Sequence, residues 1–446
     1  MSGTVQIPIW LFLLILAFAT ITFASHFLFP SVRWFLRRRM ERVVTRINER
    51  LERPIHPFKL ARRTDMIQRL VYDPQVTEAI VDYAREQGVR EDVAFEKARD
   101  YAREIVPSFS ATAYFGFAIR AARWLSRSLY EVRLNRADRG ALAEIDPQAT
   151  VVYVINHRSN MDYVLVTYLA AESSALAYAV GEWARVWPLS GLIRSMGAYF
   201  IRRKSRDDLY RRVLARYVAM ATAGGINQAM FPEGGLSLDG ALAPPRVGLL
   251  KYIVDGWDAE GRDVVFVPVA LNYDRVLEDR VLIAAGQSGE RRFRGKLGEA
   301  LAFLGRHVWL RITGRFRRFG CAAVSFGPPL GLRDFVRERG RRPEALAALL
   351  MGRIAEAMPV LPVPLVAQVL RDGRARSMAE ITAAAEGIAP RDTGDLVQAG
   401  IAGMLTRKLI RETPEGYQML PEQADAVHFY ANSIAHLELS GSAAAQ

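Results

Sequence analysis

Residues 156–163 place a histidine and an aspartate in one short stretch, Asn-His-Arg-Ser-Asn-Met-Asp-Tyr. A strand is expected to end just before His157, and Ser159 or Asn160 can cap the helix that follows. Asp162 then falls in the first turn of that helix, beside the imidazole. Histidine is the natural base for taking the proton of a hydroxyl nucleophile, as in transfer of an acyl group to an alcohol, and a carboxylate fixes its tautomer and stabilises the imidazolium. In such a transfer the acceptor hydroxyl is itself the nucleophile, so the chemistry requires no covalent acyl-enzyme.

Two further segments could bind an anionic acceptor. Residues 197–203, Gly-Ala-Tyr-Phe-Ile-Arg-Arg, read as a strand that leads into Arg202 and Arg203, whose guanidinium groups suit a phosphate. The alternative for this pair is a solvated charge pair at a strand end. Arg246 precedes an expected helix, and a helix N-terminus favours a phosphate.

A glycine-containing turn, Phe-Pro-Glu-Gly-Gly-Leu-Ser, follows an expected strand at 231–237. Glu233 is a candidate for contact with an acceptor hydroxyl. Gly234 and Gly235 allow the backbone to approach a ligand and to offer N–H groups to an anion, and Ser237 closes the segment. The alternative is an ordinary turn, because Gly-Gly is common in turns.

Pro268 interrupts an apolar run at 267–273, Val-Pro-Val-Ala-Leu-Asn-Tyr. Proline normally marks an edge strand or a bulge. It could shape one wall of a pocket, or it could serve packing alone.

The elements that must position these residues are short β-branched runs alternating with helical stretches. This alternation predicts an α/β domain with a mainly parallel sheet flanked by helices, whose sites collect at the carboxyl ends of the strands. The expected strands lie at 150–155, 175–180, 228–231, 264–271 and 322–326, and the expected helices at 161–171, 207–223 and 247–257. We assign 146–330 to this catalytic domain, 60–145 to an added N-terminal helical region and 340–440 to a C-terminal helical region.

The N-terminus predicts a membrane anchor. Residues 7–25 carry no charge and are long enough to span a bilayer, so we expect one transmembrane helix within 1–30. Basic residues follow this run and do not precede it, which argues against a cleaved signal peptide and places the catalytic part on the cytoplasmic side. Residues 31–55 predict a basic amphipathic helix lying on an anionic leaflet, or alternatively a solvated linker helix.

Composition limits the remaining possibilities. The chain has 446 residues, a net charge of +13, six histidines and one cysteine, Cys321. One cysteine cannot form an intrachain disulfide, and the scattered histidines give no metal-ligand spacing. The positive charge favours anionic partners, but no nucleic-acid-binding motif is recognisable.

Taken together, the four segments resemble the conserved blocks of the glycerolipid acyltransferase superfamily. The likeness is nearest to bacterial membrane-bound glycerol-3-phosphate and dihydroxyacetone-phosphate acyltransferases. It also covers 359–366, Pro-Val-Leu-Pro-Val-Pro-Leu-Val, and 429–437, Phe-Tyr-Ala-Asn-Ser-Ile-Ala-His-Leu. The resemblance implies His157 as base, Asp162 as its partner, and Pro268 on the acyl-donor side. It further implies a phosphate site at Arg202 and Arg246, with the glutamate–glycine turn at 233–234 shaping the acceptor site.

The resemblance implies transfer of a fatty acyl group from acyl-CoA or acyl-carrier-protein to the 1-hydroxyl of glycerol 3-phosphate, giving lysophosphatidate. Neither a metal nor a cofactor is expected. Leu236 stands where the family usually has an arginine, so dihydroxyacetone phosphate and lysophosphatidate stay open as acceptors. A non-catalytic membrane-surface protein is the alternative from another class.

Overall fold

The computed structural model describes residues 8–18, 20, 42, 44–46, 48–49, 51, 55–134, 139–170, 175–181, 189–202, 205, 207–289, 305, 309, 313 and 318–437. The chain divides into two compact units, Met1–Ile55 and His56–Gln446. In the described part of the chain, no helix combines the length and apolar character needed to cross a bilayer. The anchor predicted within 1–30 and the basic helix predicted at 31–55 lie mostly outside the described residues.

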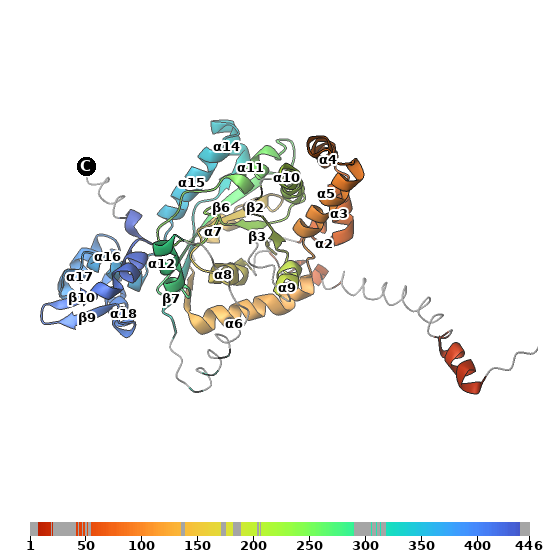
Figure 1. The fold of residues 1–446 in the computed structure, drawn as a ribbon. Helices are drawn as coiled ribbons and strands as arrows, with labels where there is room; N and C mark the ends of the chain where they lie inside the picture. The colour runs from red at the N-terminus through yellow and green to blue at the C-terminus, as the bar shows by residue number, and fades with distance from the viewer. Residues whose placement is uncertain are drawn as a thin grey trace, which may run out of the picture. The chain divides into compact units, whose positions relative to one another are not determined.

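The second unit is built on a mixed but mainly parallel sheet (Figure 1). Its strands are β1 (Glu131–Leu134), β2 (Thr150–Ile155), β3 (Ala177–Val180), β4 (Tyr199–Phe200), β5 (Gln228–Met230), β6 (Val264–Tyr273), β7 (Cys321–Phe326) and β8 (Leu330–Gly331). The order is β1-β7-β6-β2-β5-β3-β4, with β8 also paired to β6. The pairs of β6 with β7 and with β8 are antiparallel, and the other pairs are parallel. The predicted mainly parallel α/β fold is thus confirmed.

Helices and a hairpin complete the unit. Before and around the sheet lie α2 (Pro57–Leu60), α3 (Arg63–Val71), α4 (Pro74–Gln87), α5 (Glu91–Ile105), a π-helical segment (Thr112–Ala118), α6 (Ile119–Leu129), α7 (Arg139–Ala143), α8 (Met161–Ala170), α9 (Leu189–Ser195), α10 (Asp208–Ala223), α11 (Gly248–Asp255) and α12 (Asp279–Ser288). After it come α14 (Leu332–Arg339), α15 (Pro343–Glu356), α16 (Pro362–Leu370), α17 (Met378–Glu386), α18 (Thr393–Thr406), β9 (Ile410–Thr413), β10 (Gly416–Met419), a 3-10 turn (Pro421–Gln423) and α19 (Ala424–Ala431).

The alternation of side chains along β2 explains the layers of helices on the sheet. Val151 and Tyr153 belong to the core cluster that contains residues of α6 and α8. Val152 and Val154 belong to the cluster that contains residues of α10, α11 and α15. Because successive strand residues point to opposite faces, a strand that is apolar throughout is covered on both sides. Figure 1 shows these two sets of helices on opposite sides of the sheet.

The two regions predicted to be helical, 60–145 and 340–440, both contain strands, and the second includes the antiparallel hairpin of β9 and β10. Residues 60–145 were expected to be helical, but β1 lies within them and pairs with β7, with Glu131 opposite Cys321. Only four residues long and partly exposed, β1 gains its stability from a partner far along the chain. Local periodicity carries no signal for such a strand.

The C-terminal helices attach to the catalytic part through polar contacts at α12. The Tyr430 hydroxyl donates to Asp279 Oδ2 over 2.7 Å, and the Arg407 guanidinium also contacts Asp279. A second contact joins this region to β6, because Asn272 Nδ2 donates to Pro359 O over 3.0 Å. The C-terminal helices are therefore fixed to the strand end where the sequence places the site.

Candidate active site

The loop carrying the predicted base begins at the carboxyl end of β2. Asn156 Nδ2 donates to Leu271 O over 2.9 Å, and Leu271 N donates to Asn156 Oδ1 over 2.7 Å. These paired bonds tie the end of β2 to the neighbouring strand β6. The residue that follows, His157, is thereby held at the carboxyl edge of the sheet, where α/β proteins place their sites.

His157 and Asp162 are in direct contact. The imidazole Nδ1 lies 2.8 Å from Asp162 Oδ2, and the side chains are 3% and 0% exposed. Asp162 is the second residue of α8, so the helix start directs its carboxylate back to the loop. The same Oδ2 accepts from the backbone N–H groups of Arg158 (2.7 Å) and Ser159 (3.0 Å). Such a set of donors fixes the orientation of the carboxylate.

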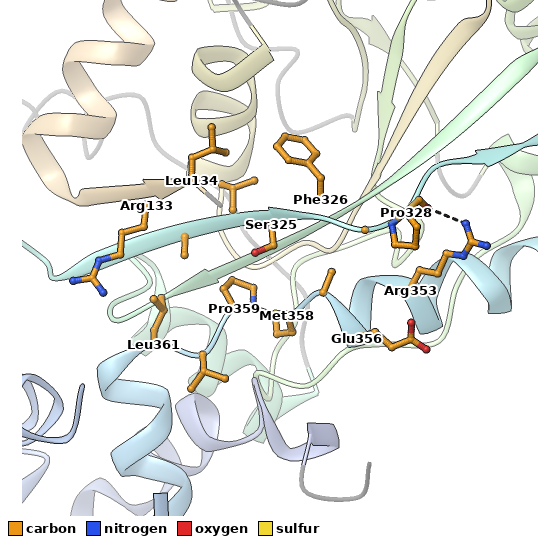
Figure 2. Close-up of a pocket in the computed structure, with 15 residues that line it drawn as sticks. Arg133, Leu134, Ser325, Phe326, Pro328, Arg353, Glu356, Met358, Pro359 and Leu361 are labelled. Atoms are coloured by element: carbon orange, nitrogen blue, oxygen red, sulfur yellow. Dashed lines mark hydrogen bonds between the residues drawn. The ribbon is translucent and has the colours of Figure 1, made fainter. Parts of the chain in front are cut away.

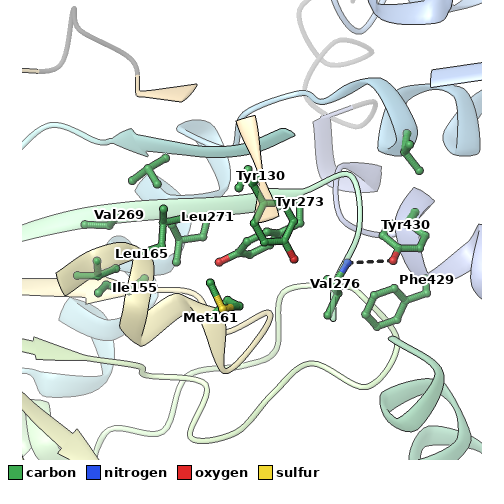
Figure 3. Close-up of a cluster of buried hydrophobic side chains, with 14 of the residues drawn as sticks. Tyr130, Ile155, Met161, Leu165, Val269, Leu271, Tyr273, Val276, Phe429 and Tyr430 are labelled. Atoms are coloured by element: carbon green, nitrogen blue, oxygen red, sulfur yellow. Dashed lines mark hydrogen bonds between the residues drawn. The ribbon is translucent and has the colours of Figure 1, made fainter. Parts of the chain in front are cut away.

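Tyr273 supplies a further donor from the end of β6. Its hydroxyl donates to Asp162 Oδ1 over 2.6 Å. Burial, and then the nearby Asp162 carboxylate, raise the pKa of Tyr273 well above its usual value. The phenol therefore keeps its proton and remains a donor. Figure 3 shows Tyr273 beside Tyr130 and near Met161, within the cluster of buried apolar side chains.

Aromatic rings enclose the imidazole. Phe231 stacks on His157 with ring centroids 4.2 Å apart, and Tyr163 meets it edge-on at 5.5 Å. Because Nδ1 faces Asp162, we assign the ring proton to Nδ1. Nε2 then carries the lone pair. The arrangement thus presents Nε2 as a base in a restricted, apolar setting.

The glycine-containing turn at 231–237 holds the backbone of His157. Glu233 Oε1 accepts from His157 N over 2.8 Å, and Oε2 accepts from Ala243 N over 3.0 Å. Ser237 N in turn donates to His157 O over 3.0 Å. Burial raises the pKa of Glu233. Glu233 and Ser237 thus position His157, a role that differs from the acceptor contact expected for Glu233.

Arg246 lies against the same turn. Its backbone N donates to Pro232 O over 2.7 Å, and its side chain is exposed. Gly234 has φ +68°, and a Cβ on it would stand 2.6 Å from Arg246 Cδ. Only glycine allows this close approach at that backbone angle. Gly235 follows, half-buried. The structure thus brings Arg246 next to the glycines, as a phosphate site would require.

Arg202 is engaged elsewhere. Its Nε and Nη2 donate to the two carboxylate oxygens of Glu104 over 2.9 and 2.7 Å. The guanidinium also lies over the rings of Tyr101 and Tyr210, with the side chain 36% exposed. The neighbouring Arg203 lies outside the described residues. A phosphate at Arg202 would have to share this guanidinium with Glu104.

Pro268 occupies a gap in the pairing of β6. One edge of β6 pairs with the parallel strand β2. The other edge pairs with β8 at Val265 and Phe266, and with β7 from Val269 onward. Pro268 lies between these two stretches, and its carbonyl accepts from Gly327 N over 2.9 Å. The backbone N and O of one strand residue point to the same edge of the strand. The N–H that Pro268 lacks would therefore point, like its carbonyl, to the break between β8 and β7. The proline is accommodated there without losing a ladder bond.

Sequence reasoning missed several residues that hold the loop. Glu278 is half-buried and accepts from Ser159 Oγ over 2.7 Å and from Asn160 N over 3.2 Å. Arg158 is 2% exposed and donates through Nη2 to Ser433 O over 3.2 Å. Arg158 and Tyr273 lie inside two of the sequence segments described above, but no role was predicted for either residue. Glu278 carried no local signal, because its partners lie over a hundred residues earlier.

A cavity of about 640 Å³ lies beside β7 (Figure 2). Its walls include Arg133, Phe326, Arg353 and Met358. None of the site residues predicted from the sequence lines it, so the chemistry is argued from the loop.

Comparisons with known proteins indicate a relationship to acyltransferases. An acyltransferase family model matches residues 141–272. A glycerol-3-phosphate acyltransferase of Pseudomonas entomophila is 31% identical over 308 residues, which are 68% of this chain and 36% of the relative. A Mycobacterium tuberculosis protein with a provisional acyltransferase name is 30% identical over 366 residues, 78% of this chain and 56% of the relative.

A crystal structure of the 1-acyl-sn-glycerophosphate acyltransferase from Thermotoga maritima aligns with 52% of this chain and 77% of that chain. The identity is 19% and the TM-score 0.30, a likeness too weak to carry an argument. The chain spans between about a third and just over half of the length of the curated relatives named here. Residues 141–272 thus belong to the acyltransferase family whose model they match, and the chain is similar to a curated glycerol-3-phosphate acyltransferase over 68% of its length.

Proposed function

We propose that this protein transfers a fatty acyl group from acyl-CoA or acyl-carrier-protein to the 1-hydroxyl of glycerol 3-phosphate, giving lysophosphatidate. The observation that carries the proposal is the His157–Asp162 contact of 2.8 Å, completed by Tyr273 on the other carboxylate oxygen. The names of the curated relatives support the acceptor.

In the proposed reaction, His157 Nε2 takes the proton of the acceptor hydroxyl as its oxygen attacks the thioester carbonyl carbon. The new C–O bond forms and the carbonyl becomes a tetrahedral oxyanion. The C–S bond then breaks, and the imidazolium returns the proton to the departing thiolate. Asp162 stabilises the imidazolium between these steps, which is the role of a buried carboxylate beside a catalytic histidine.

Arg246 is the candidate for the acceptor phosphate, because it is exposed and lies against Gly234. Arg202 contributes only if a phosphate competes with Glu104 for its guanidinium. Leu236 is half-buried and packs against the apolar core, so it offers no charge to the acceptor. These features keep dihydroxyacetone phosphate and lysophosphatidate in the panel of acceptors.

We further propose a single-pass anchor within residues 1–30 in the inner membrane, with the catalytic unit on the cytoplasmic side. The uncharged run at 7–25, followed by arginines, supports this placement. There the enzyme would meet the membrane lipid surface, its thioester donor and a phosphate-bearing acceptor.

The test is acyl transfer by membranes containing the wild-type protein, His157→Ala or His428→Ala. His428 is an exposed histidine on α19 and serves as the matched control. The donor is radiolabelled palmitoyl-CoA, repeated with acyl-carrier-protein donors, and the acceptors are glycerol 3-phosphate, dihydroxyacetone phosphate and lysophosphatidate. We expect lysophosphatidate from glycerol 3-phosphate, lost only in His157→Ala. Transfer to another acceptor alone would overturn the substrate, and no His157-dependent transfer would overturn the activity.

A further inference from the structure

Helix α6 carries aromatic and cationic side chains along its exposed face. Phe117, at the end of the π-helical segment that leads into α6, is 60% exposed, and Trp124 is 47% exposed. Arg120, Arg123 and Arg127 are exposed beside them. Spacings of three and four residues place these side chains on one side of the helix. This group of five residues is called the α6 face below.

A hollow of about 330 Å³ lies on this face. Its lining residues are Arg120, Arg123, Trp124, Arg127, Ser128 and Arg318. Four of the six are arginines and none is acidic, so the hollow attracts anions. Its volume is in the range of small-ligand pockets, enough for a phosphate-bearing headgroup.

The α6 face is held in place by the helix beneath it. Ala122, Ser126 and Leu129 are buried on the opposite side of α6. Arg127 Nε donates to the Tyr168 hydroxyl of α8 over 3.1 Å, and the Arg123 guanidinium lies 5.5 Å from the same ring. Because α8 begins at Met161, the α6 face is fixed to the helix that carries Asp162.

We propose that the α6 face docks onto the anionic surface of a lipid bilayer. Trp124 and Phe117 would enter the boundary between headgroups and acyl chains, while the arginines contact lipid phosphates. Apolar and aromatic groups beside a cationic stripe are the pattern of helices that lie in this interface. The inference goes beyond the proposed function, since none of the residues assigned to the reaction lies on α6.

The experiment uses the full-length protein with a fluorophore attached at Phe117→Cys. Cys321 is buried, and burial raises the pKa of its thiol to about 12, so it escapes labelling at neutral pH. The labelled protein is mixed with vesicles of brominated phosphatidylcholine, with or without phosphatidylglycerol, because bromine quenches only probes that reach the acyl chains. The matched position is Arg337→Cys, exposed on α14 across the sheet.

We expect strong quenching at position 117 in phosphatidylglycerol vesicles, little at position 337, and loss of quenching in concentrated salt. Replacing Arg120, Arg123 and Arg127 by glutamine should lower the docking constant by roughly two orders of magnitude. A control removes the same charge from α14 and its C-terminal side by Arg337→Gln, Arg339→Gln and Arg342→Gln, and should leave quenching at 117 unchanged.

Equal quenching at positions 117 and 337 would overturn the proposal. Quenching at 117 that is the same with and without phosphatidylglycerol would also overturn it. The proposal would also be overturned if position 117 were not quenched and the protein instead bound DNA in a way that the arginine substitutions abolish. Acyl transfer is measured in the same vesicles. If acyl transfer is intact but position 117 is not quenched, the docking proposal is overturned and the proposed function stands. If position 117 is quenched but no variant transfers an acyl group, the proposed function is overturned and the docking proposal stands.

Discussion

Tyr273 and His157 contact opposite oxygens of one carboxylate: the phenol donates to Asp162 Oδ1 over 2.6 Å, and the imidazole Nδ1 lies 2.8 Å from Oδ2. Tyr273 therefore fixes the orientation of the Asp162 carboxylate, which in turn fixes the orientation of the His157 ring. A charge-assisted hydrogen bond of this kind is worth about 1.5–3 kcal/mol.

Tyr273→Phe should lower kcat by about 10- to 100-fold, because each 1.36 kcal/mol lost from transition-state stabilisation costs about tenfold. KM for the acceptor should change little, since Tyr273 is buried beneath the loop. Steady-state kinetics with palmitoyl-CoA would measure both.

Tyr130→Phe is the matched control. The Tyr130 ring lies 5.4 Å from that of Tyr273, but its hydroxyl donates to Arg275 O over 2.8 Å. Equal losses of kcat in the two variants would mean that Tyr273 acts through packing and not through Asp162.

Asp162→Asn should lower kcat by about three to four orders of magnitude, the size seen when a buried carboxylate beside a catalytic histidine becomes an amide. The amide has one acceptor oxygen in place of two, whereas the carboxylate accepts from Tyr273, Arg158 and Ser159 as well as facing the imidazole. The melting temperature should therefore fall together with activity. Near-normal kcat in a folded Asp162→Asn protein would remove Asp162 from the mechanism.

Gly234→Ala should raise KM for the phosphate-bearing acceptor. The added Cβ would stand 2.6 Å from Arg246 Cδ and displace that side chain. Gly88 is the control: its φ of +63° matches the +68° of Gly234, but a Cβ there meets nothing within 4 Å. Both variants should lose about 1 kcal/mol of unfolding free energy, and only Gly234→Ala should change KM. Unchanged KM in both would detach Arg246 from the acceptor site.

Lys59 should make stability depend on pH. Its Nζ donates to Ala175 O over 2.6 Å, and burial lowers its pKa to about 7. Between that value and the ordinary lysine pKa of about 10.4, the unfolded chain binds more protons than the folded one. This group therefore makes the free energy of unfolding rise with pH, by at most about 1.4 kcal/mol per pH unit.

Lys59→Met removes this titration. Relative to wild type, the variant should gain stability at pH 7 and lose that advantage toward pH 10. Urea unfolding across this range measures the difference, and parallel pH profiles for the two proteins would contradict the lowered pKa.

Local pattern accounts for the parts of the site that are close in the chain. The strand at 150–155 and the helix beginning at Met161 followed from residue types, and together they place Asp162 beside His157. Tyr273, Glu233 and Glu278 reach the same loop from 76 to 119 residues away. No periodicity or turn signal in one sequence specifies such partners, because they depend on which strands become neighbours.

The same limit applies to Arg202. Two arginines after an apolar strand predict a phosphate ligand, but Glu104, 98 residues earlier on α5, binds two of the three guanidinium nitrogens of Arg202. Pro268 shows the converse case. A proline within a buried strand looked anomalous, and the break between β8 and β7 accommodates its missing N–H.

The backbone of His157 is held on both sides by the turn at 231–237: its N–H by Glu233 and its carbonyl by Ser237. During synthesis, the histidine therefore cannot reach its working position until the ribosome has delivered this turn. Tyr273 must follow before the carboxylate is oriented. A nascent chain would thus lack the complete arrangement of His157, Asp162 and Tyr273 well after its first motif has emerged.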